Sequence, residues 1–208
     1  DETISKLMSY LDSGKKAALY TPNSEIVQAC IENPGLYDII NSAEVIIPDG
    51  IGVVKAARIL KTPFKNGKVA GIEVGEKLIE HLSSTEYKVF FLGGKPGVAE
   101  KAGNVLTEKY PGIKFAGFSD GYFKKEGEEN DALIQKINDS APDVLYVCLG
   151  APAQEKWIYN NRDKLTSVKL MLALGGSLDG YAGNVKRAPK IFIKLGLEWF
   201  YRLLKEPW

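Results

Sequence analysis

A chain of 208 residues with 45% hydrophobic and 25% charged residues has the composition of an ordinary globular protein and is long enough to bury a core. Its formal net charge of +1 excludes an overall positive field, so we expect no nucleic-acid partner and any basic patch must be local. The two cysteines lack the spacing of a metal site, a redox motif or a disulfide framework, which favours a reducing cytoplasm.

Short apolar runs, typical of buried strands, alternate along the chain with amphipathic runs typical of helices. The predicted strands are residues 16–20, 43–48, 87–94, 113–118, 143–150 and 168–176. The predicted helices are residues 24–33, with Ser24 as N-cap, and residues 50–60, 71–84, 96–110, 127–140 and 151–165. Such alternation predicts an α/β, Rossmann-like fold, a parallel sheet with helices on both faces. We expect residues 1–186 to form this core.

The end of the chain, residues 187–208, is predicted to be a basic amphipathic helix. Residues 186–206 carry six basic side chains and two acidic ones, interleaved with leucines and aromatic residues. This pattern is typical of helices that lie on membrane surfaces, although the apolar side chains could equally pack on the sheet. The two interpretations are compatible, so we expect one domain overall, with the helix packed on the core and its basic flank facing an anionic membrane. No apolar run approaches the roughly 20 residues that cross a bilayer, so any membrane contact would be peripheral.

Polar or glycine-rich turns follow five of the predicted strands. Because the carboxyl ends of parallel strands meet at one edge of the sheet, where ligands bind in such folds, these turns predict a site. The turns are Thr21-Pro22-Asn23, Asp49-Gly50-Ile51-Gly52, Gly93-Gly94-Lys95-Pro96-Gly97, the run from Gly150 to Glu155 that contains Gln154, and the run from Gly175 to Gly180 that contains Gly176 and Asp179.

The turn at residues 93–97 suits a diphosphate group. Glycines let backbone N–H groups approach a ligand, a helix N-terminus attracts anions, and Lys95 next to Gly94 adds a positive charge. An ordinary tight turn with a solvated lysine is the alternative. The chain has neither the G-x-G-x-x-G fingerprint nor a Walker A sequence.

Asp49 is the first candidate for a general base, because it ends a buried strand and could hold a carboxylate near an acceptor hydroxyl. It could instead cap the helix predicted at residues 50–60. Asp179 is a second candidate with the same ambiguity. No metal site is predicted: the chain has no D-x-D motif, and its only histidine, His81, has no histidine or cysteine nearby in the sequence.

Several runs, in order along nearly the whole chain, resemble the WecG/TagA/CpsF family of glycosyltransferases. They are Thr21-Pro22-Asn23, Pro48-Asp49-Gly50-Ile51-Gly52, Val69-Ala70-Gly71, Phe91-Leu92-Gly93-Gly94, Gly150-Ala151-Pro152-Ala153-Gln154-Glu155, Gly175-Gly176-Ser177-Leu178-Asp179, Lys186-Arg187-Ala188-Pro189, Gly196-Leu197-Glu198-Trp199 and Tyr201-Arg202-Leu203. Within the family, the match is closest to members that act in wall teichoic acid synthesis.

The resemblance implies an inverting transfer that needs no metal ion or other cofactor. The donor would be UDP-N-acetylmannosamine, and the acceptor would be N-acetylglucosamine on undecaprenyl diphosphate, joined through a β-1,4 linkage at the inner face of the cell membrane. A related UDP-hexosamine or hexuronic acid transferase of polysaccharide synthesis is the alternative. Less favoured rivals are an oxidoreductase that binds a nucleotide cofactor and a peripheral membrane adaptor.

The resemblance also implies roles for individual residues. Asp49 matches the family's proposed base, and Thr21 and Gln154 match residues beside the reacting groups. The substrate-binding set is expected to comprise Asn23, Gly94, Lys95, Gly150, Gly176, Asp179 and Arg187. The chain departs from the family pattern at Lys68 and Glu73, often arginine and aspartate, so we assign these two no role. Family members continue with a further basic tail, so we expect the natural protein to extend beyond Trp208. If that tail normally covers Trp199, Phe200 and the nearby leucines, the chain without it could form homo-oligomers through these residues.

Overall fold

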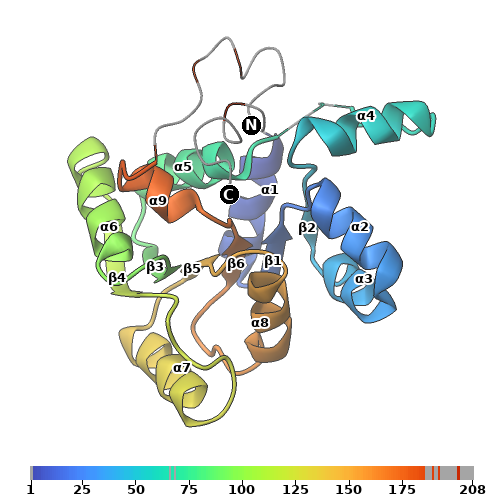
Figure 1. Cartoon of the computed structure of the whole chain (residues 1–208). Helices are drawn as coiled ribbons and strands as arrows, with labels where there is room; N and C mark the ends of the chain where they lie inside the picture. The colour runs from blue at the N-terminus through green and yellow to red at the C-terminus, as the bar shows by residue number, and fades with distance from the viewer. Residues whose placement is uncertain are drawn as a thin grey trace.

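The computed structural model of the protein describes residues 2–65, 67, 69–185, 189, 192 and 201. In this part of the chain, six strands form one sheet in the order β2-β1-β6-β5-β3-β4, and every neighbouring pair is parallel (Figure 1). The strands are β1 (Ala17–Tyr20), β2 (Val45–Ile46), β3 (Lys88–Gly93), β4 (Lys114–Ser119), β5 (Val144–Cys148) and β6 (Leu170–Ala173). The prediction of a Rossmann-like α/β fold is confirmed.

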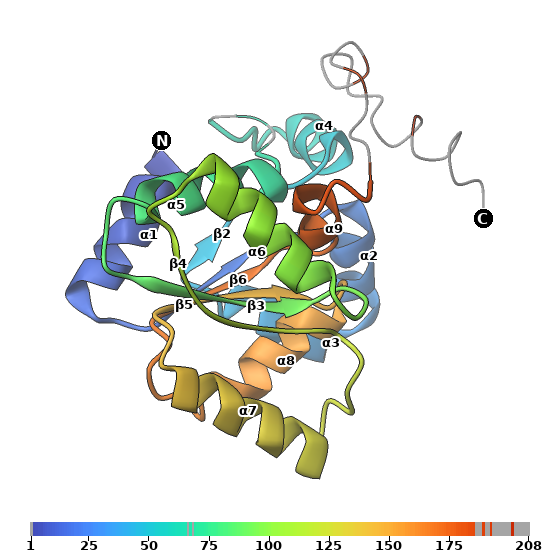
Figure 2. The ribbon, with the colours of Figure 1, turned by 90° about the vertical axis from the view of Figure 1, so that its left-hand side faces the viewer.

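Helices cover both faces of the sheet (Figure 2). One face carries α1 (Glu2–Ser13), α5 (Gly71–Leu82), α6 (Val98–Lys109) and α9 (Ser177–Tyr181). The opposite face carries α2 (Ser24–Glu32), α3 (Pro34–Asn41), α7 (Glu128–Ser140) and α8 (Ala153–Asn161). The remaining helix, α4 (Ile51–Ile59), extends away from the sheet at the β2 edge (Figure 1).

Alternation of side chains along each strand divides the core into two layers. In β5, Tyr146 and Cys148 belong to the cluster under α1, α5 and α6, whereas Leu145 and Val147 belong to the cluster under α7 and α8. All five residues of β5 are buried. Full burial of an apolar side chain contributes about 1.5–3 kcal/mol. The continuous apolar runs in the sequence therefore reflect a sheet that is buried on both sides.

The structure corrects the expected N-cap of α2 and adds a helix after it. The N-cap of α2 is Asn23, not Ser24, because the Asn23 side chain accepts a hydrogen bond from the backbone N–H of Ile26 at 3.0 Å. The added helix, α3, has Asn33 as its N-cap and Pro34 at its first position. Proline suits that position because the first N–H groups of a helix have no partner within it.

The predicted C-terminal helix, residues 187–208, lies outside the described residues except for positions 189, 192 and 201. Its packing on the core, and the division of the chain at residue 186, therefore stay predictions. Across the described residues, every helix is too short or too polar to cross a bilayer.

Candidate active site

The exits of three neighbouring strands, β1, β6 and β5, lie side by side, as expected for the predicted parallel sheet. Leu19 of β1 and Tyr146 of β5 both pair with Leu172 of β6, so the turns that follow these strands meet at one edge of the sheet. Thr21, Gln154 and Gly176 therefore come from distant parts of the sequence to the same place. This edge is where parallel α/β sheets bind ligands.

Thr21 ties the exit of β1 to the exit of β6. Its side chain is only 9% exposed, and its hydroxyl donates a hydrogen bond to the carbonyl oxygen of Ala173 at 3.1 Å. This bond satisfies the hydroxyl proton of a buried polar group and fixes the direction of its oxygen. Thr21 is thus held rigidly at the floor of the candidate site.

Gln154 ties the exit of β5 to the exit of β6. Its side-chain oxygen accepts a hydrogen bond from the backbone N–H of Gly175 at 2.9 Å, and its amide nitrogen donates to Glu155 at 2.9 Å. Beside this buried amide, Gly150 and Gly176 border open space, since a Cβ atom on either would meet nothing within 4 Å. The edge therefore combines a fixed polar floor with glycine turns that leave room for a ligand.

Asp49 does not cap the helix that follows it. The N-cap of α4 is Gly50, at a φ of 88°, and no side chain caps that helix. The Asp49 carboxylate instead accepts a long contact of 3.5 Å from the backbone N–H of Gly71, the first residue of α5. The capping alternative for residues 50–60 is therefore wrong.

Gly71 links Asp49 to the floor of the site. A Cβ atom on Gly71 would lie 3.2 Å from the Cγ2 atom of Thr21, so the start of α5 passes directly over that threonine. The backbone N–H of Asp49 also donates to the carbonyl oxygen of Pro22 at 3.2 Å. Asp49, Thr21 and Gln154 are thus connected through Gly71 and the end of β6, which brings together the three predicted catalytic residues.

Other predicted residues have structural functions of their own. Asn23 caps α2, and the Asp179 carboxylate in the first turn of α9 accepts a hydrogen bond from the Asn184 side chain at 3.3 Å. Arg187 lies outside the described residues. Substrate binding by Asn23, Asp179 and Arg187 stays a prediction.

Close packing explains why the turn after β3 begins with two glycines. Gly93 has a φ of 136°, and a Cβ atom there would overlap the backbone carbonyl of Cys148 in β5. Gly94 has a φ of 72° and packs against Val98, while the Lys95 side chain is exposed. Tight packing thus explains the two glycines, and binding of a diphosphate by Gly94 and Lys95 stays a prediction.

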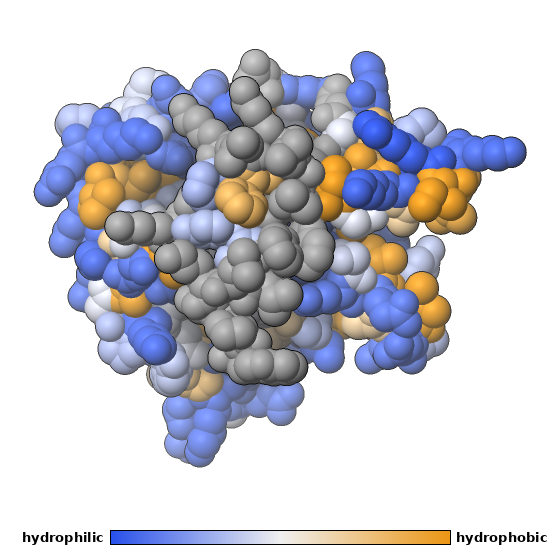
Figure 3. Space-filling view, turned by 45° about the horizontal axis from the view of Figure 1, so that its top comes forward, coloured by the Kyte–Doolittle hydropathy of each residue, from blue (hydrophilic) through white to orange (hydrophobic). Residues whose placement is uncertain are grey.

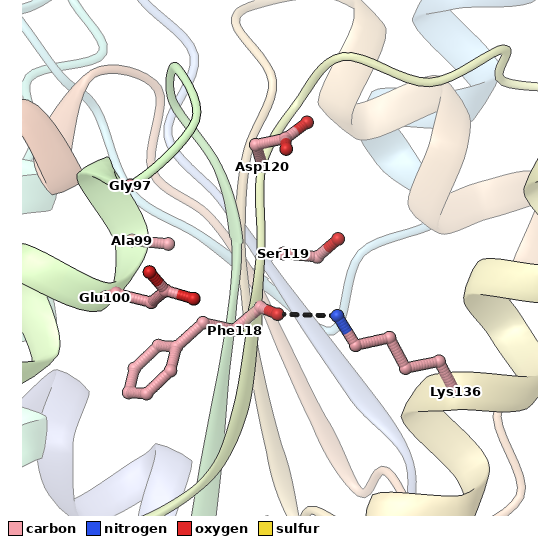
Figure 4. A pocket seen from close by; sticks show the side chains of 7 residues that line it. All are labelled: Gly97, Ala99, Glu100, Phe118, Ser119, Asp120 and Lys136. Atoms are coloured by element: carbon pink, nitrogen blue, oxygen red, sulfur yellow. Dashed lines mark hydrogen bonds between the residues drawn. The ribbon is translucent and has the colours of Figure 1, made fainter.

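Two cavities in the described part of the chain lie outside this set of residues. The smaller, about 130 Å³, sits between α6, β4 and α7, where Lys136 donates a hydrogen bond to the carbonyl oxygen of Phe118 at 2.8 Å (Figure 4). Its other lining residues are Gly97, Ala99, Glu100, Ser119 and Asp120. The larger, about 380 Å³, lies between the start of α1 and α5. The smaller is below the roughly 300–1,000 Å³ of ordinary ligand pockets, so it is too small for a nucleotide sugar.

Metal ligands do not gather anywhere in the described residues: no three His, Cys, Asp or Glu side chains come close enough to hold a metal ion. His81 is exposed on α5, and its Nδ1 atom lies 3.0 Å from the Lys77 carbonyl oxygen.

Sequence comparison identifies the family. Residues 1–208 match the sequence model described as "Glycosyl transferase WecG/TagA/CpsF family". The chain belongs to the WecG/TagA/CpsF family of glycosyltransferases. This membership confirms the resemblance seen in the sequence, and it decides against the oxidoreductase and adaptor alternatives.

Curated relatives share one enzyme name, N-acetylglucosaminyldiphosphoundecaprenol N-acetyl-beta-D-mannosaminyltransferase. The relative from Bacillus subtilis (strain 168) is 38% identical over 199 residues, which are 96% of this chain and 75% of the relative. The relative from Bacillus spizizenii is 39% identical over the same shares of both chains. The relative from Staphylococcus aureus (strain MRSA252) is 39% identical over 89% of this chain and 71% of its own length.

Two residues of this glycosyltransferase's candidate site were missed by sequence reasoning. Gly71 stands within the family-like run Val69-Ala70-Gly71, but its place between Asp49 and Thr21 depends on the fold. Glu155 is completely buried beside Gln154, and one of its carboxylate oxygens has no hydrogen-bond partner among the described residues. Burial raises the pKa of the Glu155 carboxyl, and the hydrogen bond from Gln154 partly opposes that rise.

Proposed function

We propose that this glycosyltransferase moves N-acetylmannosamine from UDP-N-acetylmannosamine to N-acetylglucosamine held on undecaprenyl diphosphate. The product is the β-1,4-linked disaccharide lipid of the wall teichoic acid linkage unit. The observation that carries this proposal is the enzyme name shared by relatives that are 38–39% identical and align with up to 96% of the chain. The polar edge formed by the β1, β5 and β6 exits supplies a matching place for the reaction.

In the proposed mechanism, Asp49 is the general base. Its carboxylate takes the proton of the acceptor 4-hydroxyl while that oxygen attacks the anomeric carbon from the face opposite UDP. The bond between the anomeric carbon and the diphosphate oxygen breaks, its electron pair leaves with UDP, and the configuration inverts. Thr21 and Gln154, held by their bonds to β6 and its exit, position the sugar against Asp49.

The diphosphate leaving group needs positive charge, which we propose comes from the protein alone. Backbone N–H groups at the start of α6 and the Lys95 ammonium group stand at the exit of β3. Calorimetric binding of UDP with and without EDTA tests this point. Equal affinity in both buffers supports a reaction without a metal ion, and loss of binding in EDTA refutes it.

Substitution of Asp49 tests the mechanism. Asp49→Asn keeps the size of the side chain and removes its basicity, so the transfer rate falls by about 10²–10⁴-fold while UDP affinity stays within a few-fold. Asp163→Asn is a matched control, because this exposed aspartate follows the far end of α8. Near-normal transfer by Asp49→Asn would mean that another group is the base.

The donor sugar is tested with a panel of UDP-sugars on one lipid acceptor. The proposal expects the highest kcat/KM with UDP-N-acetylmannosamine. Preference for another UDP-hexosamine or for a UDP-hexuronic acid would favour the alternative transferase of polysaccharide synthesis. Because the proposed acceptor is anchored in lipid, we also propose that the enzyme works peripherally at the inner face of the cell membrane.

A further inference from the structure

The tip of α4 and the turn after it expose large apolar side chains. Ile59 is 80% exposed, Leu60 is 73% exposed and Phe64 is 42% exposed. Val54 is the buried residue of this helix, which extends outward from the β2 edge of the sheet (Figure 1). Three neighbouring apolar side chains exposed on a projecting element indicate a surface for interaction.

The charged residues within this stretch of the chain are all positive. Residues 50–72 contain five lysines and arginines and no aspartate or glutamate. Lys55, Arg58, Lys61 and Lys65 are exposed in the structure. In the space-filling view, hydrophobic and strongly hydrophilic side chains stand next to one another on the projecting helix (Figure 3). We call residues 55–65 the α4 tip.

A neighbouring surface shows that exposure alone does not produce this combination. Val27 and Ile31 on α2 are 42% and 74% exposed, and Tyr37 on α3 is 57% exposed. Residues 24–41, however, contain Glu25, Glu32 and Asp38 among their acids and no lysine or arginine. The two surfaces expose comparable apolar side chains and differ in the sign of their charge.

We propose that the α4 tip docks on the surface of an anionic lipid bilayer. Ile59, Leu60 and Phe64 enter the boundary between headgroups and acyl chains, while the surrounding lysine and arginine side chains meet lipid phosphates. A basic residue near an anionic membrane surface favours binding severalfold, and the effect falls off within a Debye length. The acidic α2–α3 surface is repelled by the same lipids.

A second copy of the chain fits the α4 tip less well than an anionic lipid surface does. A symmetric dimer would place the α4 tip of one copy against the same tip of its partner. Four exposed positive charges on each side would then face one another, since the acids that could pair with them are missing from residues 50–72. Charge complementarity therefore favours the lipid surface.

The position of the α4 tip suits a lipid-linked acceptor, and this consequence rests on the proposed function. Asp49 stands two residues before α4, and a helix of nine residues is about 13 Å long. A docked tip would therefore hold the candidate base within about one helix length of the membrane. Docking itself requires neither the donor nor the acceptor.

A fluorescent probe on the tip tests the proposal directly. In a Cys30→Ser background, an environment-sensitive dye is attached at Leu60→Cys or, as the matched control, at Ile31→Cys. With vesicles of phosphatidylglycerol and phosphatidylcholine, the emission of the dye at position 60 shifts to shorter wavelength, and the dye at position 31 does not change. Binding of the protein without a shift at position 60, or with equal shifts at both positions, would overturn the proposal.

Sedimentation with the same vesicles measures the contribution of the tip. Ile59→Ser with Leu60→Ser, and separately Lys55→Gln with Arg58→Gln and Lys61→Gln, each weaken binding by roughly tenfold or more. Val27→Ser with Ile31→Ser leaves binding unchanged. Equal binding by all variants would overturn the proposal. A dimer in the absence of vesicles that dissociates when Ile59→Ser and Leu60→Ser are introduced would overturn it as well. The vesicles contain no sugar substrate, so failure here is distinct from failure of the proposed transfer.

Discussion

Gln154 and Gly175 are joined by a hydrogen bond of 2.9 Å that crosses from the exit of β5 to the exit of β6. The opposite end of the same amide donates to Glu155, also at 2.9 Å. Gly175 leads into Gly176, the N-cap of α9, whose first turn carries Asp179. The amide of Gln154 therefore fixes the turn that holds one side of the candidate site.

Gln154→Leu should damage the site more than the fold. Leucine has a similar volume, but it leaves the Gly175 N–H and the Glu155 carboxyl without this partner, at a cost of about 1–3 kcal/mol in stability. Displacement of the β6 turn by about 1 Å could lower kcat by up to about 100-fold. Steady-state transfer kinetics and thermal unfolding measure the two effects.

Gln135→Leu is the matched control for that variant. Gln135 lies exposed on α7, where its amide donates to Asp139 at 2.7 Å. Its replacement should leave both kcat and stability nearly unchanged. Equal kcat for Gln154→Leu and Gln135→Leu would contradict a positioning role for Gln154.

Glu155 should make the fold less stable as pH rises. Burial raises the pKa of its carboxyl above that in the unfolded chain, so the folded protein binds the proton more tightly. The stabilising contribution of the protonated carboxyl is complete below the ordinary glutamate pKa and is lost as pH rises through the raised value. Glu155→Gln, which stays neutral, should therefore unfold at a higher temperature than the parent above that window, and the difference should shrink at acid pH.

Thermal unfolding measured across pH checks this expectation, with Glu128→Gln as the control. Glu128 is exposed at the start of α7, and the same substitution there should not reproduce the pH-dependent gain expected of Glu155→Gln. A Glu155→Gln variant whose unfolding temperature stays parallel to that of the parent at every pH would show that the carboxyl does not titrate in this way.

The sheet could be predicted from the sequence because its strands are buried on both faces. Runs such as residues 144–149 are apolar without interruption, and the polar turns that follow such runs predicted which edge of the sheet carries the candidate site. The short helix α3 was missed because Asn33-Pro34 reads as a loop, although in the structure Asn33 caps and Pro34 begins that helix. An Asn-Pro pair is compatible with a loop or with the start of a helix, and tertiary packing determines which of the two forms.

The connections within the site could not be predicted, because they join residues that are distant in sequence. The Thr21 hydroxyl meets the Ala173 carbonyl across 152 positions, and Gly71 reaches Asp49 across 22. Sequence spacing gave Asp49 two equal interpretations, and only the geometry of Gly50 removed the capping one. Residue types thus supplied the candidate side chains, while the fold determined how they are connected.

Gly75 allows α5 to approach the sheet closely, so Gly75→Ala should destabilise the protein. Alanine usually favours a helix, but its Cβ here would overlap the Tyr181 hydroxyl and lie 2.8 Å from Leu174. The same region contains the hydrogen bond from the Tyr146 hydroxyl to the Gly75 carbonyl oxygen at 2.8 Å. The expected loss is about 1–3 kcal/mol, measured by chemical unfolding.

Gly52→Ala provides the comparison within another helix. Gly52 is exposed in α4, and its added Cβ would meet only the Ser24 side chain, at 3.3 Å. This change should leave stability unchanged or raise it slightly, because alanine favours the helix by about 1 kcal/mol. A Gly75→Ala variant as stable as Gly52→Ala would indicate that α5 can move away from the sheet without cost.

The two cysteines should differ sharply in reactivity. Burial raises the pKa of the Cys148 thiol to about 12, and the side chain is 6% exposed, so about one molecule in 10⁴ carries the reactive thiolate at pH 8. Cys30 is half-buried at the end of α2, and burial raises the pKa of its thiol as well. Native protein treated with a thiol reagent at pH 8 should therefore release one equivalent of chromophore per chain, and unfolded protein should release two. Cys30→Ser should release none until it unfolds, and rapid reaction of that variant in its native state would mean that β5 opens far more often than a buried central strand should.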